Sequence, residues 1–171
     1  IGQRFTEVVN SPAWSELQEK YNNCDDIYVL GHGGNMGVAD HTAIDMTRLS
    51  NGTKNAMCPG SCIVATSLIN DTSFEQWMVT WLQHRTSTRT VDQMKRSLVY
   101  GISSSGQSTD TLKALQWASD NGASVISMSL GGGGYASYTD SAVDYATENG
   151  TVVIAASGND NSGSVSYPSA Y

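Results

Sequence analysis

The sequence predicts an α/β protein, a three-layer α-β-α sandwich in which five parallel strands have the order 2-1-3-4-5. Apolar runs typical of strands alternate with helical patterns along the 171 residues, and this alternation implies right-handed crossovers and parallel pairing. Several of the runs are apolar throughout, as in strands that helices cover on both faces. Glycine- or serine-rich segments follow two of them, at 31–35 and 103–108. We therefore expect one domain over residues 1–171.

Local signals place the elements along the chain. Ser11-Pro12 predicts a helix start, because proline fits the first helical position. Asn121-Gly122 and Asn149-Gly150 predict the ends of two later helices. The expected helices are 12–21, 36–49, 61–69, 73–84, 109–120 and 137–148, the expected strands are 27–30, 55–58, 98–102, 125–130 and 152–156, and 86–90 is expected to be a polar linker.

The composition argues against several classes of partner. The formal net charge is −7 with only nine Lys and Arg, so neither a nucleic acid nor an anionic membrane surface is expected. No apolar run approaches the roughly 20 residues that a membrane-spanning helix needs. Cys24, Cys58 and Cys62 are an odd number without the usual metal or redox spacing. We expect reduced thiols and a cytoplasmic location.

A serine-rich segment between a strand and a helix is the first candidate site. The strand 98–102 leads into Ser103, Ser104, Ser105 and Ser108, and a helical pattern follows. Ser108 or Thr109 is placed to cap that helix, and Asp110 lies in its first turn. Hydroxyls beside the unpaired N–H groups of a helix start suit an anion, above all a phosphate. The alternative is an ordinary strand-to-helix connection rich in small residues.

The glycine-rich segment 31–35 is expected to lie near this serine cluster. Ligands of open α/β sheets bind beyond the carboxyl ends of the strands, where the strand order reverses. Both segments follow strands, so they can flank that point. The alternative is that both are simply tight turns.

His41 and Asp45 form a second candidate. They are four residues apart on an expected helix, so their side chains share a face. This pair is half of a zinc site and needs at least one further ligand. Without that ligand it is an ordinary exposed polar pair.

Residues 1 to about 115 resemble a sugar isomerase (SIS) domain, most closely the phosphoheptose isomerase branch. The matching strings are IYVLGHGGN, ADHTAID, INDTSFE and YGISSSGQS. The resemblance implies a five-stranded parallel sheet between helices and a phosphosugar or phosphate ligand. The implied ligand-binding residues are Gly33, Gly34, Asn35, Ser103, Ser104, Ser105 and Ser108. Family members often have Asn at the position of His32 and Ser at that of Asn35.

The same resemblance bears on metal and catalysis. Phosphoheptose isomerases show His and Glu at the spacing of His41 and Asp45, and the Glu is also an acid/base. Asp45 is thus the candidate catalytic residue, with zinc as the candidate metal. The other ligands come from C-terminal helices whose counterparts are not found here, because no His follows His84. The family's site lies where two subunits meet, which implies a homodimer unless the graft described below removes that interface.

From about 114 onward the chain resembles a subtilase, a subtilisin-type serine protease. The matching strings are ALQWASDNGASVISMSLGG, AVDYATENGTVVIAASGND and SYPSAY. The resemblance implies a substrate-pocket wall at Ser129–Gly132 and an oxyanion donor at Asn159. The family's GTSMA, HGTH and DTG strings, which carry its Ser, His and Asp, are absent. Protease activity is therefore not expected.

Together, the two resemblances suggest an engineered or recombined chimera: an SIS-like part over 1–113 and a subtilase-like segment over 114–171 that completes the sheet. The expected function is weak phosphosugar binding with little or no isomerase activity. One alternative is a folded scaffold without biochemical activity. Another is a protease-dead subtilase relative that binds peptides.

Overall fold

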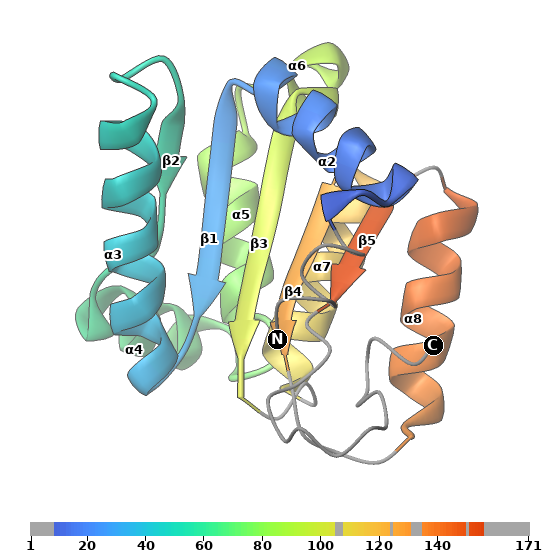
Figure 1. Cartoon of the computed structure of the whole chain (residues 1–171). Coiled ribbons are helices and arrows are strands. Elements are labelled where there is room, and N and C mark those ends of the chain that lie inside the picture. Colours follow the sequence, from blue (N-terminus) through green and yellow to red (C-terminus); the bar gives the residue numbers. More distant parts are fainter. Residues whose placement is uncertain (1–8, 105–107, 124, 131–134, 150, 156–171) are drawn as a thin grey trace.

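A parallel five-stranded sheet is the centre of the structure (Figure 1). The computed structural model describes residues 9–104, 108–123, 125–130, 135–149 and 151–155. The strand order is β2-β1-β3-β4-β5, and every neighbouring pair is parallel. The strands are β1 (Asp26–Gly31), β2 (Asn55–Met57), β3 (Ser97–Ser103), β4 (Val125–Leu130) and β5 (Val152–Ala155). The predicted α/β class with a parallel sheet is confirmed.

Helices cover both faces of the sheet (Figure 1). One face carries α2 (Pro12–Asn23) and α3 (Gly34–Leu49), and the other carries α4 (Cys62–Asp71), α5 (Trp77–Thr86), α7 (Thr109–Asp120) and α8 (Ser137–Glu148). A short helix, α6 (Val91–Lys95), precedes β3. Within the described ranges, no helix has both the length and the apolar character needed to cross a bilayer.

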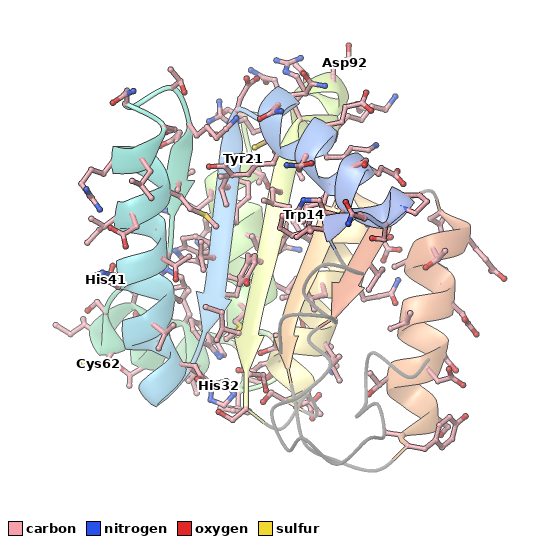
Figure 2. All side chains as sticks on the ribbon, viewed as in Figure 1. Trp14, Tyr21, His32, His41, Cys62 and Asp92 are labelled. Atoms are coloured by element: carbon pink, nitrogen blue, oxygen red, sulfur yellow. The ribbon has the colours of Figure 1, made fainter. Side chains whose placement is uncertain are left out.

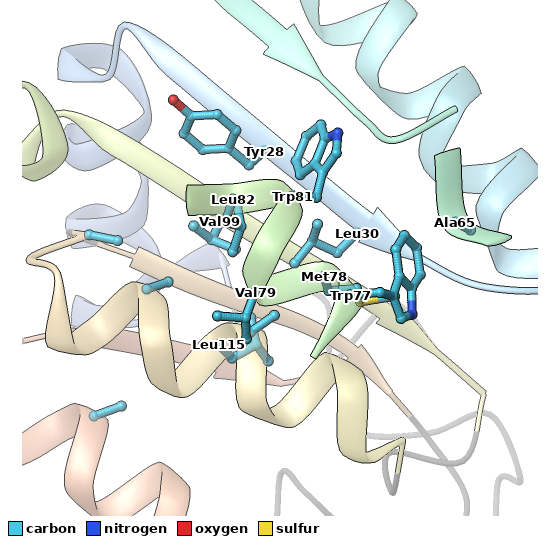
Figure 3. Packing of buried hydrophobic residues seen from close by; sticks show 14 residues of the cluster. Tyr28, Leu30, Ala65, Trp77, Met78, Val79, Trp81, Leu82, Val99 and Leu115 are labelled. Atoms are coloured by element: carbon cyan, nitrogen blue, oxygen red, sulfur yellow. The ribbon is translucent and has the colours of Figure 1, made fainter. Parts of the chain in front are cut away.

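Two apolar cores, one on each face, hold the layers together. All six residues of β1 are buried. Tyr28 and Leu30 face the core that α5 and α7 cover, where Trp77 and Trp81 pack (Figure 3). Ile27, on the opposite face, packs with α2 and α3. The alternation follows from the two-residue period of a strand, and it explains why β1 is an unbroken apolar run in the sequence.

Some element boundaries differ from the expected ones. α5 begins at Trp77 rather than 73, because Ser73 O accepts the amides of both Gln76 and Trp77 in a tight turn. α6 was not predicted. It starts with a capping box in which Thr90 Oγ1 accepts from Gln93 N at 3.3 Å, while Gln93 Oε1 accepts from Thr90 N at 2.9 Å.

Gly31 sets how closely α3 approaches the end of β1. A Cβ atom at this position would lie 2.6 Å from the carbonyl oxygen of Asn35, in the first turn of α3. Such a contact is too short for a carbon and an oxygen, so only glycine allows this approach. On the same helix, a Cβ atom added at Gly37 would meet nothing within 4 Å.

A charge pair with the buried Asp26 ties the segment between α5 and α6 to the amino end of β1. Arg89 Nη2 donates to Asp26 Oδ1 at 2.9 Å, with side chains 29% and 6% exposed. Asn55 Nδ2 donates to the same oxygen at 2.8 Å. The expected polar linker 86–90 therefore has an anchor in the sheet.

We predict that Gly31→Ala lowers the free energy of unfolding by roughly 1–3 kcal/mol, since the new methyl group forces α3 away from β1. Gly37→Ala, the matched control, adds a methyl group in open space inside a helix and should stabilise by up to about 1 kcal/mol. Urea denaturation of both variants measures the difference. Equal stabilities would show that the close approach at Gly31 is unimportant.

We predict that Arg89→Ala lowers the free energy of unfolding by roughly 1–3 kcal/mol, because it leaves the buried Asp26 carboxylate short of a donor. Arg96→Ala is the control. Its partner is Asp25, and the two side chains are 48% and 59% exposed, so the loss should stay under about 1 kcal/mol. Urea denaturation of both variants measures the two losses. A lower urea midpoint for Arg96→Ala than for Arg89→Ala would contradict the assignment of Arg89 as the anchor.

Candidate functional site

The carboxyl ends of β1 and β3 form the candidate site. These strands pair in parallel, with Gly31 opposite Ile102, so the segments that leave them start side by side. β1 leads to α3 on one face, and β3 leads to α7 on the other (Figure 1). At this position the connections from two neighbouring strands run to opposite faces of the sheet. It is the topological switch point, where open parallel sheets bind their ligands. The site therefore lies between the amino ends of two helices.

Three side-chain contacts join the two segments. Asn35 Nδ2 donates to Ser104 Oγ at 3.2 Å, and His32 Nε2 lies 3.0 Å from Ser108 Oγ. Ser108 Oγ also lies 3.0 Å from Ser103 Oγ. Figure 2 shows His32 at the end of β1. The structure thus brings the predicted asparagine and three of the four predicted serines together, and it adds His32.

The remaining predicted ligand residues of this site are glycines and one serine. Gly33 precedes α3 with a φ of 57°, a conformation that favours glycine, and Gly34 is the first residue of the helix. Both are exposed. They can contribute backbone N–H groups only. Ser105 lies outside the described residues.

Ser108 is the residue before the first turn of α7, but its hydroxyl makes no capping bond to the helix. Instead the hydroxyl faces His32 and Ser103. In the first turn, Asp110 Oδ1 accepts from Thr111 N at 2.9 Å. Ser108 is thus the N-cap residue, as expected, but its hydroxyl belongs to the cluster that joins the two segments.

Besides His32, Asp110 is a residue of the site that sequence analysis did not assign to it. Its side chain is fully buried, and Trp77 Nε1 donates to its Oδ2 at 3.1 Å. Its Oδ1 lies 3.6 Å from His32 Nε2. One signal could have found it: Asp110, Ala114 and Ala118 are four residues apart, so the aspartate shares the apolar face of the helix.

Ser108, His32 and Asp110 include the three residue types of a serine-protease triad, but the geometry differs. A triad uses both ring nitrogens, one toward the serine and one toward the aspartate. Here the same nitrogen, His32 Nε2, faces both Ser108 Oγ and Asp110 Oδ1. The carboxylate thus lies on the serine side of the ring and does not hold the other nitrogen, as the aspartate of a triad does. The arrangement therefore supplies hydrogen-bond donors rather than an activated nucleophile.

An aromatic ring and an ion pair lie beside His32. The Phe74 ring packs edge-on against the imidazole, with centroids 5.8 Å apart. The neighbouring residue Glu75 forms an ion pair with Lys113 of α7. Asn70 and Asp71, which the SIS resemblance pointed to, are exposed and hydrogen-bond to each other.

His41 lies on the outer side of α3 (Figure 2), and Asp45 lies one turn further along the helix. His41 Nε2 is 3.3 Å from Asp45 Oδ2, and the histidine side chain is 80% exposed. Asp45 Oδ1 also accepts from Arg48 at 3.0 Å, and this bond lowers the pKa of Asp45. Among the described residues, no group of three or more His, Cys, Asp and Glu is placed to hold a metal. Zinc binding by this pair stays a prediction.

Cys24, Cys58 and Cys62 are free thiols, as expected. Burial raises the pKa of Cys58 to about 11. Gly60 N donates to its sulfur at 3.0 Å. A thiol that holds its proton to this pH is a poor nucleophile and a poor metal ligand near neutrality.

The subtilase-like candidates fall largely outside the described structure. Ser129 belongs to β4, which ends at Leu130. Gly131, Gly132 and Asn159 lie outside the described residues.

The fold is similar to that of a solved phosphoheptose isomerase from Neisseria gonorrhoeae. The similarity has a TM-score of 0.63 and covers 90% of this chain and 77% of the isomerase chain. The sequences are 19% identical, so the likeness concerns the fold alone.

Curated relatives by sequence are proteases. Halolysin from Haloferax mediterranei is 56% identical over 69 residues, which are 40% of this chain and 13% of halolysin. A halolysin-like extracellular serine protease from Natrialba magadii is 51% identical over 71 residues, 42% of this chain and 13% of that protein. Subtilisin Savinase from Lederbergia lenta is 42% identical over 73 residues, 43% of this chain and 27% of Savinase. The aligned stretches thus amount to 13–27% of these relatives' own lengths.

The family comparison covers more of the chain than these alignments. Residues 42–171 match the sequence profile of the subtilase family, Peptidase S8. The chain combines a fold similar to that of an SIS protein with this sequence match, and by the match it belongs to the subtilase family.

Proposed function

We propose that the chain binds the phosphate group of a small phosphorylated sugar between the carboxyl ends of β1 and β3. The observation that carries this proposal is the convergence of donors from two strand ends: His32 and Asn35 after β1, and Ser104 and Ser108 after β3. Hydroxyl, amide and imidazole groups can all donate to phosphate oxygens. The amino end of α7 adds a favourable dipole at the same place.

The buried Asp110 carboxylate limits the affinity. Its negative charge opposes an anion, although the donors Trp77 Nε1 and Thr111 N stabilise it. Among the described residues, the four donor side chains bond to one another and to Ser103, and none of these bonds involves a Lys or Arg. We therefore propose weak binding, in which hydroxyl and amide groups replace the arginine clamp of a strong phosphate site.

We do not propose isomerisation within a single chain. Moving a proton between adjacent carbons needs a positioned acid/base group. Asp45, the candidate for this role, lies ten residues after Asn35 on α3, which is roughly 15 Å along a helix axis. A homodimer stays a prediction, as does a cytoplasmic location.

We also infer a mosaic origin. A chain that belongs to the subtilase family by sequence has a fold similar to that of a phosphoheptose isomerase over 90% of its length. The expected join near 114 lies in α7, and parallel strands with right-handed crossovers flank that helix on both sides. A join within such a helix leaves the sheet continuous.

The test is a thermal-shift titration with inorganic phosphate and with sedoheptulose 7-phosphate, with the free sugar as the control. At ten times the dissociation constant, binding to the native state adds about 1.4 kcal/mol, or roughly 3–6 °C in Tm. Ser108→Ala should weaken the binding about tenfold, since a hydroxyl donor to a charged ligand is lost.

Ser87→Ala is the matched control variant. Ser87 follows α5, is exposed, and donates to His84 O at 3.2 Å, so its replacement should leave the shift unchanged. A wild-type chain that responds to neither phosphate compound overturns the proposal and favours the inactive scaffold. Stabilisation by peptides alone would instead favour the peptide-binding subtilase relative.

A further inference from the structure

Phe74 is an exposed aromatic side chain next to the donor groups of the site. Its ring lies edge-on to the imidazole of His32, with centroids 5.8 Å apart and an angle of 82° between the planes. The same imidazole lies 3.0 Å from Ser108 Oγ. Phe74 nevertheless keeps 48% of its surface in contact with water. Ligand-binding sites combine an apolar wall with a few polar groups in this way.

The turn that carries Phe74 is held firmly against the rest of the protein. Ser73 O accepts the amides of Gln76 and Trp77, both at 3.1 Å, and so closes the turn around Phe74. Trp77 is fully buried (Figure 3), and its indole Nε1 donates to Asp110 Oδ2 at 3.1 Å. The fold itself therefore keeps the phenyl ring at the surface beside His32.

An ion pair lies next to this ring in the chain. Glu75 pairs with Lys113 of α7, and the two side chains are 54% and 44% exposed. A carboxylate accepts several hydrogen bonds and an ammonium group donates three, so both keep bonding capacity for hydroxyl groups. Their charges cancel, and the pair therefore offers no net attraction to a second anionic group.

We propose that Phe74 is a specificity-determining residue, whose ring packs against the C–H face of the sugar while the donors around Ser108 hold its phosphate. The inference rests on the function proposed above and adds the residue that distinguishes a sugar phosphate from a phosphate without a sugar. The neutral Glu75–Lys113 pair beside the ring favours a monophosphate with hydroxyl groups over a bisphosphate.

The physical basis is the apolar surface of the exposed ring. An edge-on contact with His32 covers at most one face of the phenyl ring. The face of an aromatic ring carries partial negative charge, so it attracts C–H groups, and covering it removes apolar area from water. A phosphate without a sugar gains neither contribution. A sugar phosphate should therefore bind about three- to tenfold more tightly, as expected for burying half of a phenylalanine side chain.

The test compares glucose 6-phosphate with methyl phosphate by calorimetry at one fixed pH and ionic strength. Both are phosphate monoesters with a second pKa near 6, so their charges match. The wild-type chain should bind glucose 6-phosphate about three- to tenfold more tightly. Phe74→Ala should abolish this preference and leave the affinity for methyl phosphate unchanged. Phe74→Leu keeps apolar bulk without a flat ring and should keep part of the preference.

Tyr145→Ala is the matched control variant. Tyr145 is an aromatic residue of α8 with 43% exposure. It lies beside Asp120, the last residue of α7, whereas the site lies at the first turn of that helix. Its replacement should leave both affinities unchanged. Circular dichroism and Tm establish that all variants are folded.

A second measurement reports the contact directly. Nuclear Overhauser effects should join the ring protons of Phe74 to the C–H protons of bound glucose 6-phosphate. A ring with a purely structural role would not show them.

The outcomes distinguish the two proposals. If the wild-type chain binds neither phosphate compound, the proposed function is wrong. If it binds both equally, or if Phe74→Ala keeps the preference, the role of Phe74 is wrong while the phosphate site stands. If Phe74→Ala weakens both ligands by the same factor, the ring acts only by positioning His32, and its role as a sugar wall is likewise wrong.

Discussion

The pairing of β1 with β3 is the constraint on which the rest of the structure depends. These strands lie at the middle of the sheet, and both are buried between helical layers. Their register places Gly31 beside Ile102, so the start of α3 lies next to the end of β3 and Asn35 reaches Ser104. A slip of one residue would turn the apolar side chains of β1 from one core to the other. The fold core and the site geometry therefore depend on the same set of backbone hydrogen bonds.

Much of this fold could be predicted from the sequence because burial on both faces leaves a plain pattern. β1 and β3 are apolar runs, and the helices between strands show their own period. The tight turn before Trp77 has no such pattern, since its two backbone bonds to Ser73 depend on local geometry. α6 was missed although the spacing of Thr90 and Gln93 is a readable capping signal. A five-residue helix simply has too few turns to show a period.

The position of the site could be predicted from the sequence, but not all of its residues could. Parallel strands place their carboxyl ends at one edge, so the glycine and serine segments had to meet. The role of Asp110 could not be predicted in this way. An acidic residue in the first turn of a helix is ordinarily exposed and interacts with the helix dipole. Its burial depends on Trp77, which belongs to a different helix, and on His32, which follows another strand. Contacts between elements distant in sequence leave no local signal.

The family and the fold point to different chemistries, and our proposal rests on the geometry of the site. A fold hosts many functions, so similarity to an isomerase at 19% identity supplies a scaffold and not an activity. Membership of the subtilase family likewise supplies no nucleophile by itself, because the serine of a Ser-His-Asp triad needs a histidine nitrogen free to accept its proton. His32 presents the same nitrogen to Ser108 and to the buried carboxylate. One nitrogen cannot both hold a proton for Asp110 and take a proton from Ser108. This arrangement differs from a triad, and for this reason we proposed anion binding for the site rather than attack on a carbonyl group.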